Sequence, residues 1–386
     1  MTINGRHKMH QLIILGNGFD LTCGLRSSVS QFFSARTNGM NSVDSIPKDD
    51  QNVWDIILGE VSKGDPLWCD IEGLIATWIY GEHGKSSKVH RLYHPRAVAI
   101  NIMDENSIRR AYCPKGDVYR FALANLNKAE LSQEELTDFL LCQLKDYESC
   151  FAYYLSGQVR GASGIYEENA RRFFAAIRDA CLGGRNYESL SCSILNFNYT
   201  VPFGADDYRL GLDRVRNVHG IIDATDTIFG IDGKDVEEDS AALPFTKTYR
   251  LLALETGQRR NLLIRGEHPT GYIKVFGHSL APADYSYFQA IFDGVNLYSS
   301  DVVLVFLYKV YANEPDGSSN ENTIREDLYR RIAHLLIEYG ATLDNKDHGK
   351  NLMHKLLLEQ RLIIKKIDNP SVLPKNIYIR SEVAGA

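Results

Sequence analysis

The feature that most constrains the fold is a short apolar segment that stops at a glycine-rich loop. Gln11-Leu-Ile-Ile-Leu15 is apolar and partly β-branched, and it ends abruptly at Gly16. This pattern predicts a buried parallel strand. The loop Gly16-Asn-Gly-Phe-Asp20 follows, and then Leu21–Phe33 shows helix-like apolar spacing only in part. Strand, glycine loop and helix form the opening of a nucleotide-binding βαβ unit, so we expect an α/β protein with a Rossmann-type parallel sheet.

A long helical section then interrupts the alternation of strands and helices. Apolar periodicity and prolines place it between the first strand unit and the rest of the sheet. We therefore expect a nucleotide-binding core of residues 10–38 and 165–310, a large helical insertion of residues 39–164, and a C-terminal extension of residues 311–386 packed on the core. Helices should cover both faces of the sheet.

Further elements follow from apolar periodicity. In the core we predict strands at 193–197, 215–218, 227–229, 272–276 and 302–308, and helices at 168–182, 247–254 and 284–292. In the insertion we predict helices at 53–61, 71–80, 117–126 and 131–155. In the extension we predict helices at 326–339 and 351–360, strands at 362–367 and 376–380, and before them a polar loop at 313–322.

Composition narrows the classes of function. The chain has 386 residues and a formal net charge of −6, and this mild acidity argues against nucleic acid as a general partner. The seven cysteines form no CxxC pair, so we expect reduced thiols and no metal site. The longest apolar stretch, Val302–Tyr308, suits a buried strand. We expect a cytoplasmic protein with no membrane segment and no signal peptide.

The glycine loop is the first candidate for ligand binding. After a strand, Gly16-x-Gly18 lets backbone N–H groups approach a phosphate, so we assign Gly16, Asn17, Gly18 and Phe19 to cofactor binding. The third glycine of the dehydrogenase fingerprint would fall at Leu21, so hydride transfer is not expected. The alternative is a tight turn that needs flexible glycines.

Two further candidates follow predicted strands, at whose carboxyl ends open α/β sheets bind ligands. Asn198 can hold ribose hydroxyls or a carboxamide, with Tyr199 beside it, or it can simply turn the chain. His219 is a candidate general base, or a structural histidine.

A third strand end carries Gly277, His278 and Ser279, with Asp284 shortly after. Gly277 permits close backbone approach, and Ser279 can donate to a phosphate or a ribose. The alternative is a strand exit followed by a helix whose N-cap is Asp284.

Charged residues outside the strand ends add two possibilities. In Trp68-Cys-Asp-Ile-Glu72, Asp70 and Glu72 could supply a carboxylate to an oxocarbenium-like transition state. They could equally cap the helix that begins at Ile71. Lys247 could counter a phosphate, or lie exposed on its helix.

The order of these motifs resembles the AbiH family of phage abortive-infection proteins. The resemblance covers roughly residues 11 to 310. It rests on Gly16-Asn-Gly-Phe-Asp-Leu21 with Gly24-Leu25, Trp68–Glu72, Leu195-Asn-Phe-Asn-Tyr-Thr200, Val218-His-Gly220, Ile228-Phe-Gly-Ile-Asp232 and Phe276-Gly-His-Ser-Leu280 with Asp284.

This pattern in turn looks like a divergent sirtuin-like domain, and several bacterial defence proteins with that domain cleave NAD. The resemblance implies that Gly16 and Gly18 contact the pyrophosphate, that Asn198 holds the nicotinamide ribose and that His219 is catalytic. Asp20 stands where such loops carry serine, and Thr200 replaces an aspartate. The zinc-binding cysteine pairs of deacylating sirtuins are missing, so deacylation is not expected.

Three hypotheses follow. The first is hydrolysis of the nicotinamide–ribose bond of NAD by Asn198 and His219, with a carboxylate such as Asp20 or Glu72 stabilising positive charge on the ribose. The second is a sensor that binds NAD or ADP-ribose without catalysis and signals to a partner. The third is a phage-activated nuclease, which scattered acidic residues would have to assemble in space. An active NADase would be toxic to its own cell, so its activity must be controlled. We expect a phage-derived trigger or a homo-oligomer to provide this control.

Overall fold

The computed structural model describes residues 8–40, 42–62, 71–80, 116–162, 164–182, 189–203, 210–222, 226–234, 236–238, 240–253, 262–263, 269–310 and 321–368. The predicted strand at 376–380, most of the loop at 313–322, and Trp68 to Asp70 lie outside these residues.

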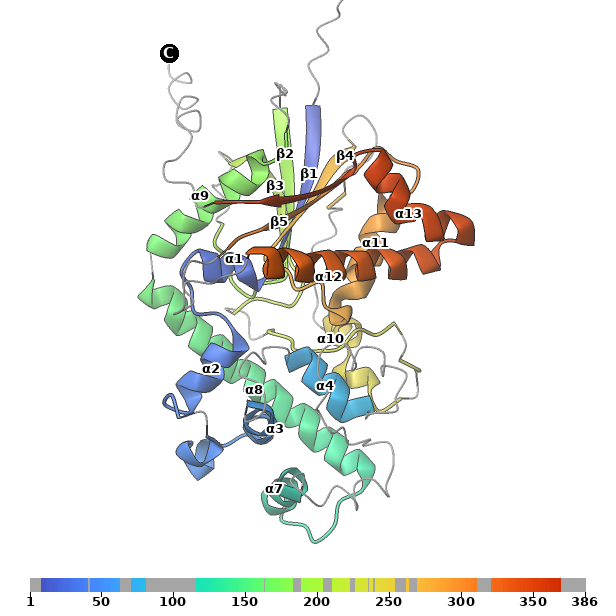
Figure 1. Ribbon diagram of the computed structural model, residues 1–386. Helices are drawn as coiled ribbons and strands as arrows, with labels where there is room; N and C mark the ends of the chain where they lie inside the picture. The colour runs from blue at the N-terminus through green and yellow to red at the C-terminus, as the bar shows by residue number, and fades with distance from the viewer. Residues whose placement is uncertain are drawn as a thin grey trace, which may run out of the picture.

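A parallel sheet of six strands forms the centre of the core (Figure 1). Its strands are β1 (Lys8–Leu15), β2 (Ser189–Asn196), β3 (Leu212–Asn217), β4 (Thr270–Phe276), β5 (Val303–Tyr308) and β6 (Leu362–Lys366). Their order is β3-β2-β1-β4-β5-β6, and every neighbouring pair is parallel. This is the strand order of a Rossmann-like fold, as predicted.

Side chains of β1 alternate between two hydrophobic clusters, so the strand is buried on both faces. Leu12 and Ile14 pack with apolar side chains of α11 (Tyr285–Gly294), α12 (Glu321–Thr342) and α13 (Lys346–Leu358). Ile13 and Leu15 pack with α1 (Asn17–Thr22) and α9 (Ile165–Asp179). Helices therefore cover both faces, and an uninterrupted apolar strand is the sequence signature of this arrangement.

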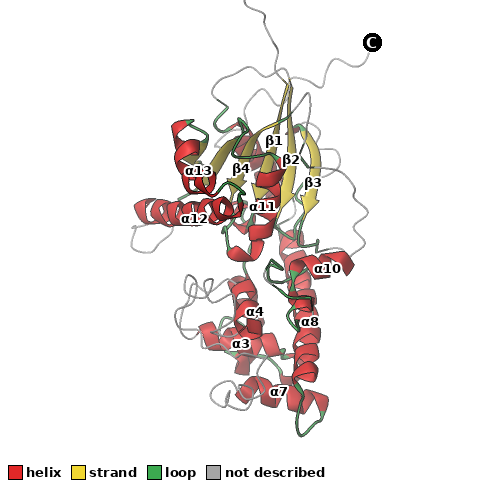
Figure 2. Cartoon of the chain, turned by 90° about the vertical axis from the view of Figure 1, so that its right-hand side faces the viewer, coloured by secondary structure: helices red, strands yellow, loops and turns green. Residues whose placement is uncertain are grey.

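The helical insertion lies below the sheet in Figures 1 and 2, on the side toward which the strand arrows point. Its helices are α3 (Val53–Ser62), α4 (Ile71–Tyr80), α7 (Gly116–Leu126) and α8 (Gln133–Gly161). They share one hydrophobic cluster that includes Trp54, Leu140 and Tyr147. A capping box at Ser132 fixes the start of α8.

Two predicted elements are wrong. The segment Leu21–Phe33 is not one helix, because α1 ends at Thr22 and α2 (Val29–Arg36) begins after a break that contains Gly24 at φ +95°. Serine capping at Ser28 starts the second helix. The segment 227–229 is extended but forms no strand, and the only ladder contact nearby in the described chain is a bridge between Ile231 and Thr246.

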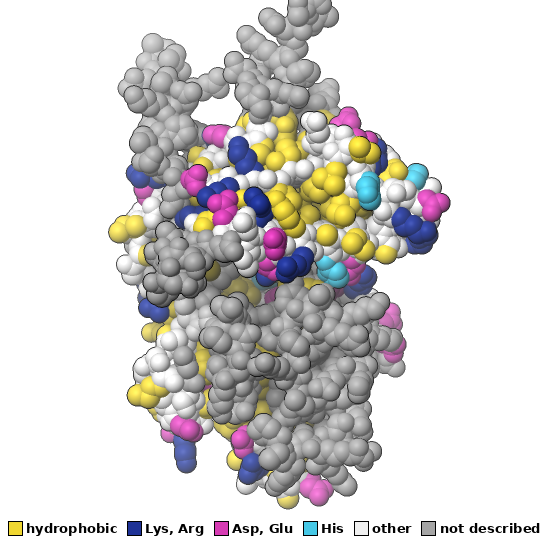
Figure 3. Space-filling view, in the orientation of Figure 1, with side chains coloured by type: hydrophobic (Ala, Val, Ile, Leu, Met, Phe, Trp, Pro, Cys, Tyr) yellow, Lys and Arg dark blue, Asp and Glu magenta, His cyan; other side chains and the backbone are white. Residues whose placement is uncertain are grey.

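The extension adds to the core, since α12 and α13 pack on the sheet and β6 becomes its edge strand next to β5. In Figure 3, hydrophobic side chains gather in the upper half of this face, and charges of both signs are scattered around them. Within the described residues, no helix has the length and apolar character needed to span a bilayer.

Candidate functional site

A cavity of about 390 Å³ opens at the carboxyl ends of the strands. The chain leaves β1 toward β2 and β3, and β4 continues the sheet from the other side of β1. This reversal creates the crevice at which open α/β sheets bind ligands. The predicted site residues line the cavity, except Gly18 and Phe19: Gly16, Asn17, Asp20, Glu72, Asn198, Tyr199, His219, Gly277, His278, Ser279 and Asp284.

The glycine loop packs backbone to backbone against the loop that follows β4. The N–H groups of Gly16 and Gly18 donate to the carbonyl oxygens of Phe276 and Gly277, at 3.0 and 2.9 Å. A Cβ on Gly18 would lie 2.7 Å from the Cα of Gly277, which has φ +70°. The two N–H groups are therefore already used within the protein. The side chain of Phe19 is fully buried in the hydrophobic cluster on the α9 side of the sheet.

The carboxylate of Asp20 is held by two hydroxyl groups. Tyr166 and Thr200 each donate a hydrogen bond of 2.7 Å to it. Burial raises the pKa of Asp20 to about 6, although both hydrogen bonds oppose the shift. The two positions that depart from the sirtuin-like pattern, Asp20 and Thr200, are thus partners in one buried network, and Tyr166 is a member that the sequence did not indicate.

Asn198 is fixed by the residue that ends β2. Its backbone N–H and its Nδ2 both donate to Oδ1 of Asn196, at 3.2 and 2.9 Å. Its own Oδ1 is buried and accepts no hydrogen bond from the described residues. Because an unsatisfied buried acceptor is costly, this oxygen is suited to accept a hydrogen bond from a ligand.

A buried lysine joins two carboxylates at the inner end of the cavity. The Nζ of Lys247, at the start of α10 (Lys247–Ala253), lies 2.5 Å from Oδ1 of Asp284 and 2.6 Å from Oε1 of Glu72. Lys247 is only 2% exposed, so the expectation of an exposed lysine was wrong. Asp284 occupies the N-cap position of α11 but its side chain makes no capping bond, because it binds Lys247 instead.

The charged groups of this cluster shift one another's pKa values. Burial alone would raise the pKa of Asp284, but Lys247 and the neighbouring imidazoles outweigh it and hold that pKa well below its usual range. Burial alone would likewise lower the pKa of Lys247, but the two carboxylates raise it well above the ordinary lysine value. At neutral pH the cluster therefore contains one ammonium and an ionised Asp284.

Two histidines face Asp284. Nε2 of His219 lies 3.2 Å from its Oδ1, without the alignment of a hydrogen bond. Burial, and then Lys247, lower the pKa of His219 to about 4, so its ring is neutral at pH 7. Nε2 of His278 lies 3.3 Å from Oδ2. Its Nδ1 accepts the N–H of Leu280 at 2.9 Å, which leaves the ring proton on the nitrogen that faces Asp284.

Two acidic residues that are far apart in the sequence, Glu72 and Asp284, meet beside His219 in the folded chain. Ligand atoms of Glu72, His219 and Asp284 all lie within 4.8 Å of one another, a spacing that could hold a metal ion. The ammonium of Lys247 is in contact with both carboxylates of this group. A metal ion bound to both carboxylates would therefore have to displace the lysine or share the carboxylates with it.

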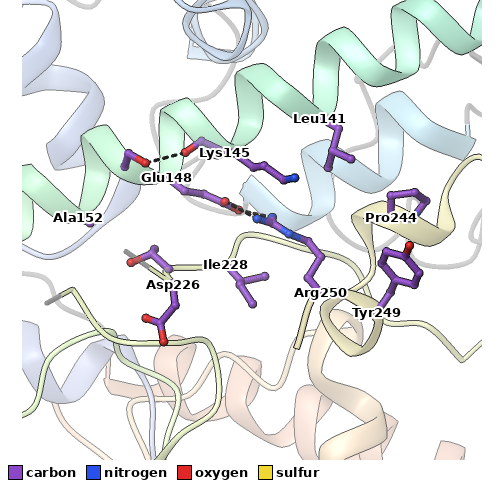
Figure 4. A pocket seen from close by; sticks show the side chains of 11 residues that line it. Leu141, Lys145, Glu148, Ala152, Asp226, Ile228, Pro244, Tyr249 and Arg250 are labelled. Atoms are coloured by element: carbon purple, nitrogen blue, oxygen red, sulfur yellow. Dashed lines mark hydrogen bonds and ion pairs between the residues drawn. The ribbon is translucent and has the colours of Figure 1, made fainter. Parts of the chain in front are cut away.

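A second cavity, of about 300 Å³, is lined by side chains of α8 and α10 and by Asp226 and Ile228 (Figure 4). Phe229 lines the first cavity and its neighbour Ile228 lines the second. The N–H of Ile228 donates to the carbonyl oxygen of His219 at 3.0 Å. Glu148 of α8 and Arg250 of α10 form a buried ion pair across the second cavity.

The sheet order defines a Rossmann-like α/β fold, and the polar crevice lies at its β1–β4 switch point. Residues 12–307 match the model of the family described as "Bacteriophage abortive infection AbiH". The chain therefore belongs to the AbiH family and is a phage abortive-infection defence protein. No curated protein matches the chain.

Proposed function

We propose that this protein hydrolyses NAD at the bond between nicotinamide and ribose. The observation that carries the proposal is the meeting of Asn198, His219 and the carboxylates of Asp284 and Glu72 in one crevice. The cavity volume falls within the range of small-molecule sites. The resemblance of the Gly16, Asn198 and His219 motifs to sirtuin-like domains supports the choice of NAD.

Asn198 orients the substrate. Its Oδ1 is buried and open to a donor, and the NH₂ of the nicotinamide carboxamide or a ribose hydroxyl supplies one. Its Nδ2 donates to Asn196, so the amide cannot rotate without breaking that bond, and the backbone N–H of Asn198 is held by the same oxygen. Such preorganisation places the scissile bond without further ordering during the reaction.

The carboxylates stabilise the charge that develops during bond cleavage. As the bond from the ribose C1′ to the ring nitrogen breaks, its electron pair goes to the nitrogen and the positive charge passes to the ribose. The cluster contains Glu72 and Asp284 against the single ammonium of Lys247, so with both carboxylates ionised its negative charge stabilises the positive charge that develops on the ribose in the transition state. Fixed charges act strongly in a site from which water is excluded.

Water completes the reaction. Its oxygen forms a bond to C1′, and its proton passes to the ring of His219, which is neutral at pH 7 because burial lowers its pKa to about 4. The imidazolium is stabilised by Asp284, whose Oδ1 lies 3.2 Å from Nε2. The products are nicotinamide, ADP-ribose and one proton, which His219 returns to solvent.

The test is NAD loss with purified protein, alone and with lysate from phage-infected cells. We expect His219→Ala and Asn198→Ala each to slow hydrolysis at least about 100-fold. His334→Ala is the matched control, because His334 is a half-exposed histidine on α12. Full activity in the double variant His219→Ala, Asn198→Ala would overturn the proposed site. Nucleotide binding without turnover under either condition would replace the hydrolase by a sensor.

A further inference from the structure

Among the residues that the structure describes, one positively charged side chain lies on the surface of the cavity. Among the described residues that line it, Arg331 is the only lysine or arginine, whereas Asp20, Glu72 and Asp284 are acidic. Lys247 lies behind this surface, enclosed by two carboxylates. An anionic group of a ligand therefore has one cationic partner to approach.

Arg331 comes from outside the family-matched part of the chain. It lies on α12, in the extension, whereas the match ends at residue 307. In Figure 1, α12 crosses the sheet at the end that faces the insertion. The extension thus completes the wall of a cavity whose other described lining residues all belong to the matched part.

Two contacts hold the guanidinium of Arg331 in place, and they leave some of its N–H donors available for a ligand. Its Nη1 donates to the carbonyl oxygen of Ser279 at 3.0 Å, and its Nη2 lies 2.8 Å from Oδ2 of Asp327, one turn earlier on α12. These contacts involve two of the five N–H donors of an arginine. The side chain is 36% exposed, so a ligand can reach it from the mouth of the cavity.

The sequence of the glycine loop suggests a second phosphate-binding site, but its backbone N–H groups are not free to form one. The N–H groups of Gly16 and Gly18 donate to the loop after β4, so they are not available to a phosphate without opening that packing. A pyrophosphate in the cavity would therefore need donors other than these two N–H groups, and a cationic side chain can supply them. Arginine is the residue best suited to this role, because its planar fork matches phosphate oxygens.

We propose that Arg331 binds the pyrophosphate of the dinucleotide and thereby selects ligands that carry phosphates. This inference rests on the proposed function for the identity of the ligand. It also gives the ligand a direction, with its cationic nicotinamide end toward the carboxylate cluster and its anionic end toward α12.

Arg331→Gln tests the assignment, and Arg330→Gln is the matched control. Arg330 is the preceding residue of α12, is 76% exposed and pairs with Glu326; its replacement removes the same charge from the same helix. Calorimetry would measure the dissociation constants of ADP-ribose and of nicotinamide riboside, which has no phosphate. We expect Arg331→Gln to weaken ADP-ribose binding about 10- to 100-fold, to leave the riboside within about twofold, and Arg331→Lys to lie in between.

The outcomes separate this inference from the proposed reaction. Equal ADP-ribose binding by native protein and Arg331→Gln would overturn the role of Arg331 alone, as would an equal loss for both ligands. Suppose that Arg331→Gln weakens the binding of ADP-ribose but not of the riboside, and that the native protein never consumes NAD. This result would support the role of Arg331 in phosphate binding and overturn the proposed hydrolysis. No binding of ADP-ribose by native protein would overturn the role of Arg331, whereas the hydrolase is overturned only by the absence of NAD loss.

Discussion

Replacing Lys247 by methionine removes the ammonium between Glu72 and Asp284 while keeping a side chain of similar length. The Nζ of Lys247 lies 2.6 Å from Glu72 and 2.5 Å from Asp284, and these carboxylates are 15% and 7% exposed, respectively. Without the ammonium they become neighbouring, poorly solvated negative charges. Breaking a buried pair by removing one partner typically costs about 3–5 kcal/mol, and we expect a loss of that size in the free energy of unfolding at pH 8.

Urea unfolding at several pH values is the assay, because the loss should depend on pH. In the native protein Asp284 has a lowered pKa, so it contributes stability above its unfolded pKa and loses it only as the pH falls through the folded value. In Lys247→Met, burial is no longer opposed by the ammonium and raises that pKa. The cost is then present above the unfolded pKa and decreases as protonation neutralises the carboxylate, so the difference between the two proteins should narrow toward pH 5.

Lys234→Met provides the control. Lys234 is 33% exposed and lies 3.1 Å from Glu338, a partly exposed pair for which a loss of less than about 1 kcal/mol is expected. A loss for Lys247→Met within 1 kcal/mol of this control at pH 8 would refute the reasoning. Adding Glu72→Gln to Lys247→Met should recover part of the loss, because it removes one of the two unpaired charges.

Three further predictions concern the same cavity. Gly277→Ala should lower the melting temperature, because Gly277 has φ +70° and a Cβ there would lie 2.5 Å from the backbone N of Phe19; an unchanged melting temperature would contradict the close packing. Because burial lowers the pKa of His219 to about 4, stability should fall as the pH drops from about 6.5 to 4, and less so in His219→Gln, as urea midpoints would show. Tyr166→Phe should cost about 1.5–3 kcal/mol and raise the pKa of Asp20 above about 6 in a carbon-13 NMR titration, since it deletes a donor to that carboxylate; an unchanged pKa would argue against the bond.

The parallel sheet explains how far the site could be predicted. Asn198, His219 and Gly277 each follow a segment that the sequence predicts as a strand, and parallel strands bring their carboxyl ends to one edge. Local patterns separated by many residues therefore converge once the sheet is assumed. The sheet itself was predictable because strands such as Val303–Tyr308 are continuously apolar, as expected for burial on both faces.

The features of the site that could not be predicted depend on contacts between residues far apart in the sequence. A lysine at the start of a short helix is ordinarily exposed, and only the contacts with Glu72 and Asp284, from distant segments, make the burial of Lys247 tolerable. The same holds for the N–H groups of Gly16 and Gly18, which resemble a phosphate cradle in the sequence but donate to residues that follow β4.

Glu72 links the insertion to the chemistry of the core. It lies in the first turn of α4, whereas Lys247 begins α10 and Asp284 is the N-cap residue of α11. The charge of Lys247 is shared between one carboxylate from the insertion and one from the core. Drawing α4 away would leave the ammonium to Asp284 alone and change the field at His219, whose pKa already depends on both groups. A trigger acting on the insertion would therefore alter the surroundings of His219 without entering the cavity, and under the proposed function this contact is a means of restraint.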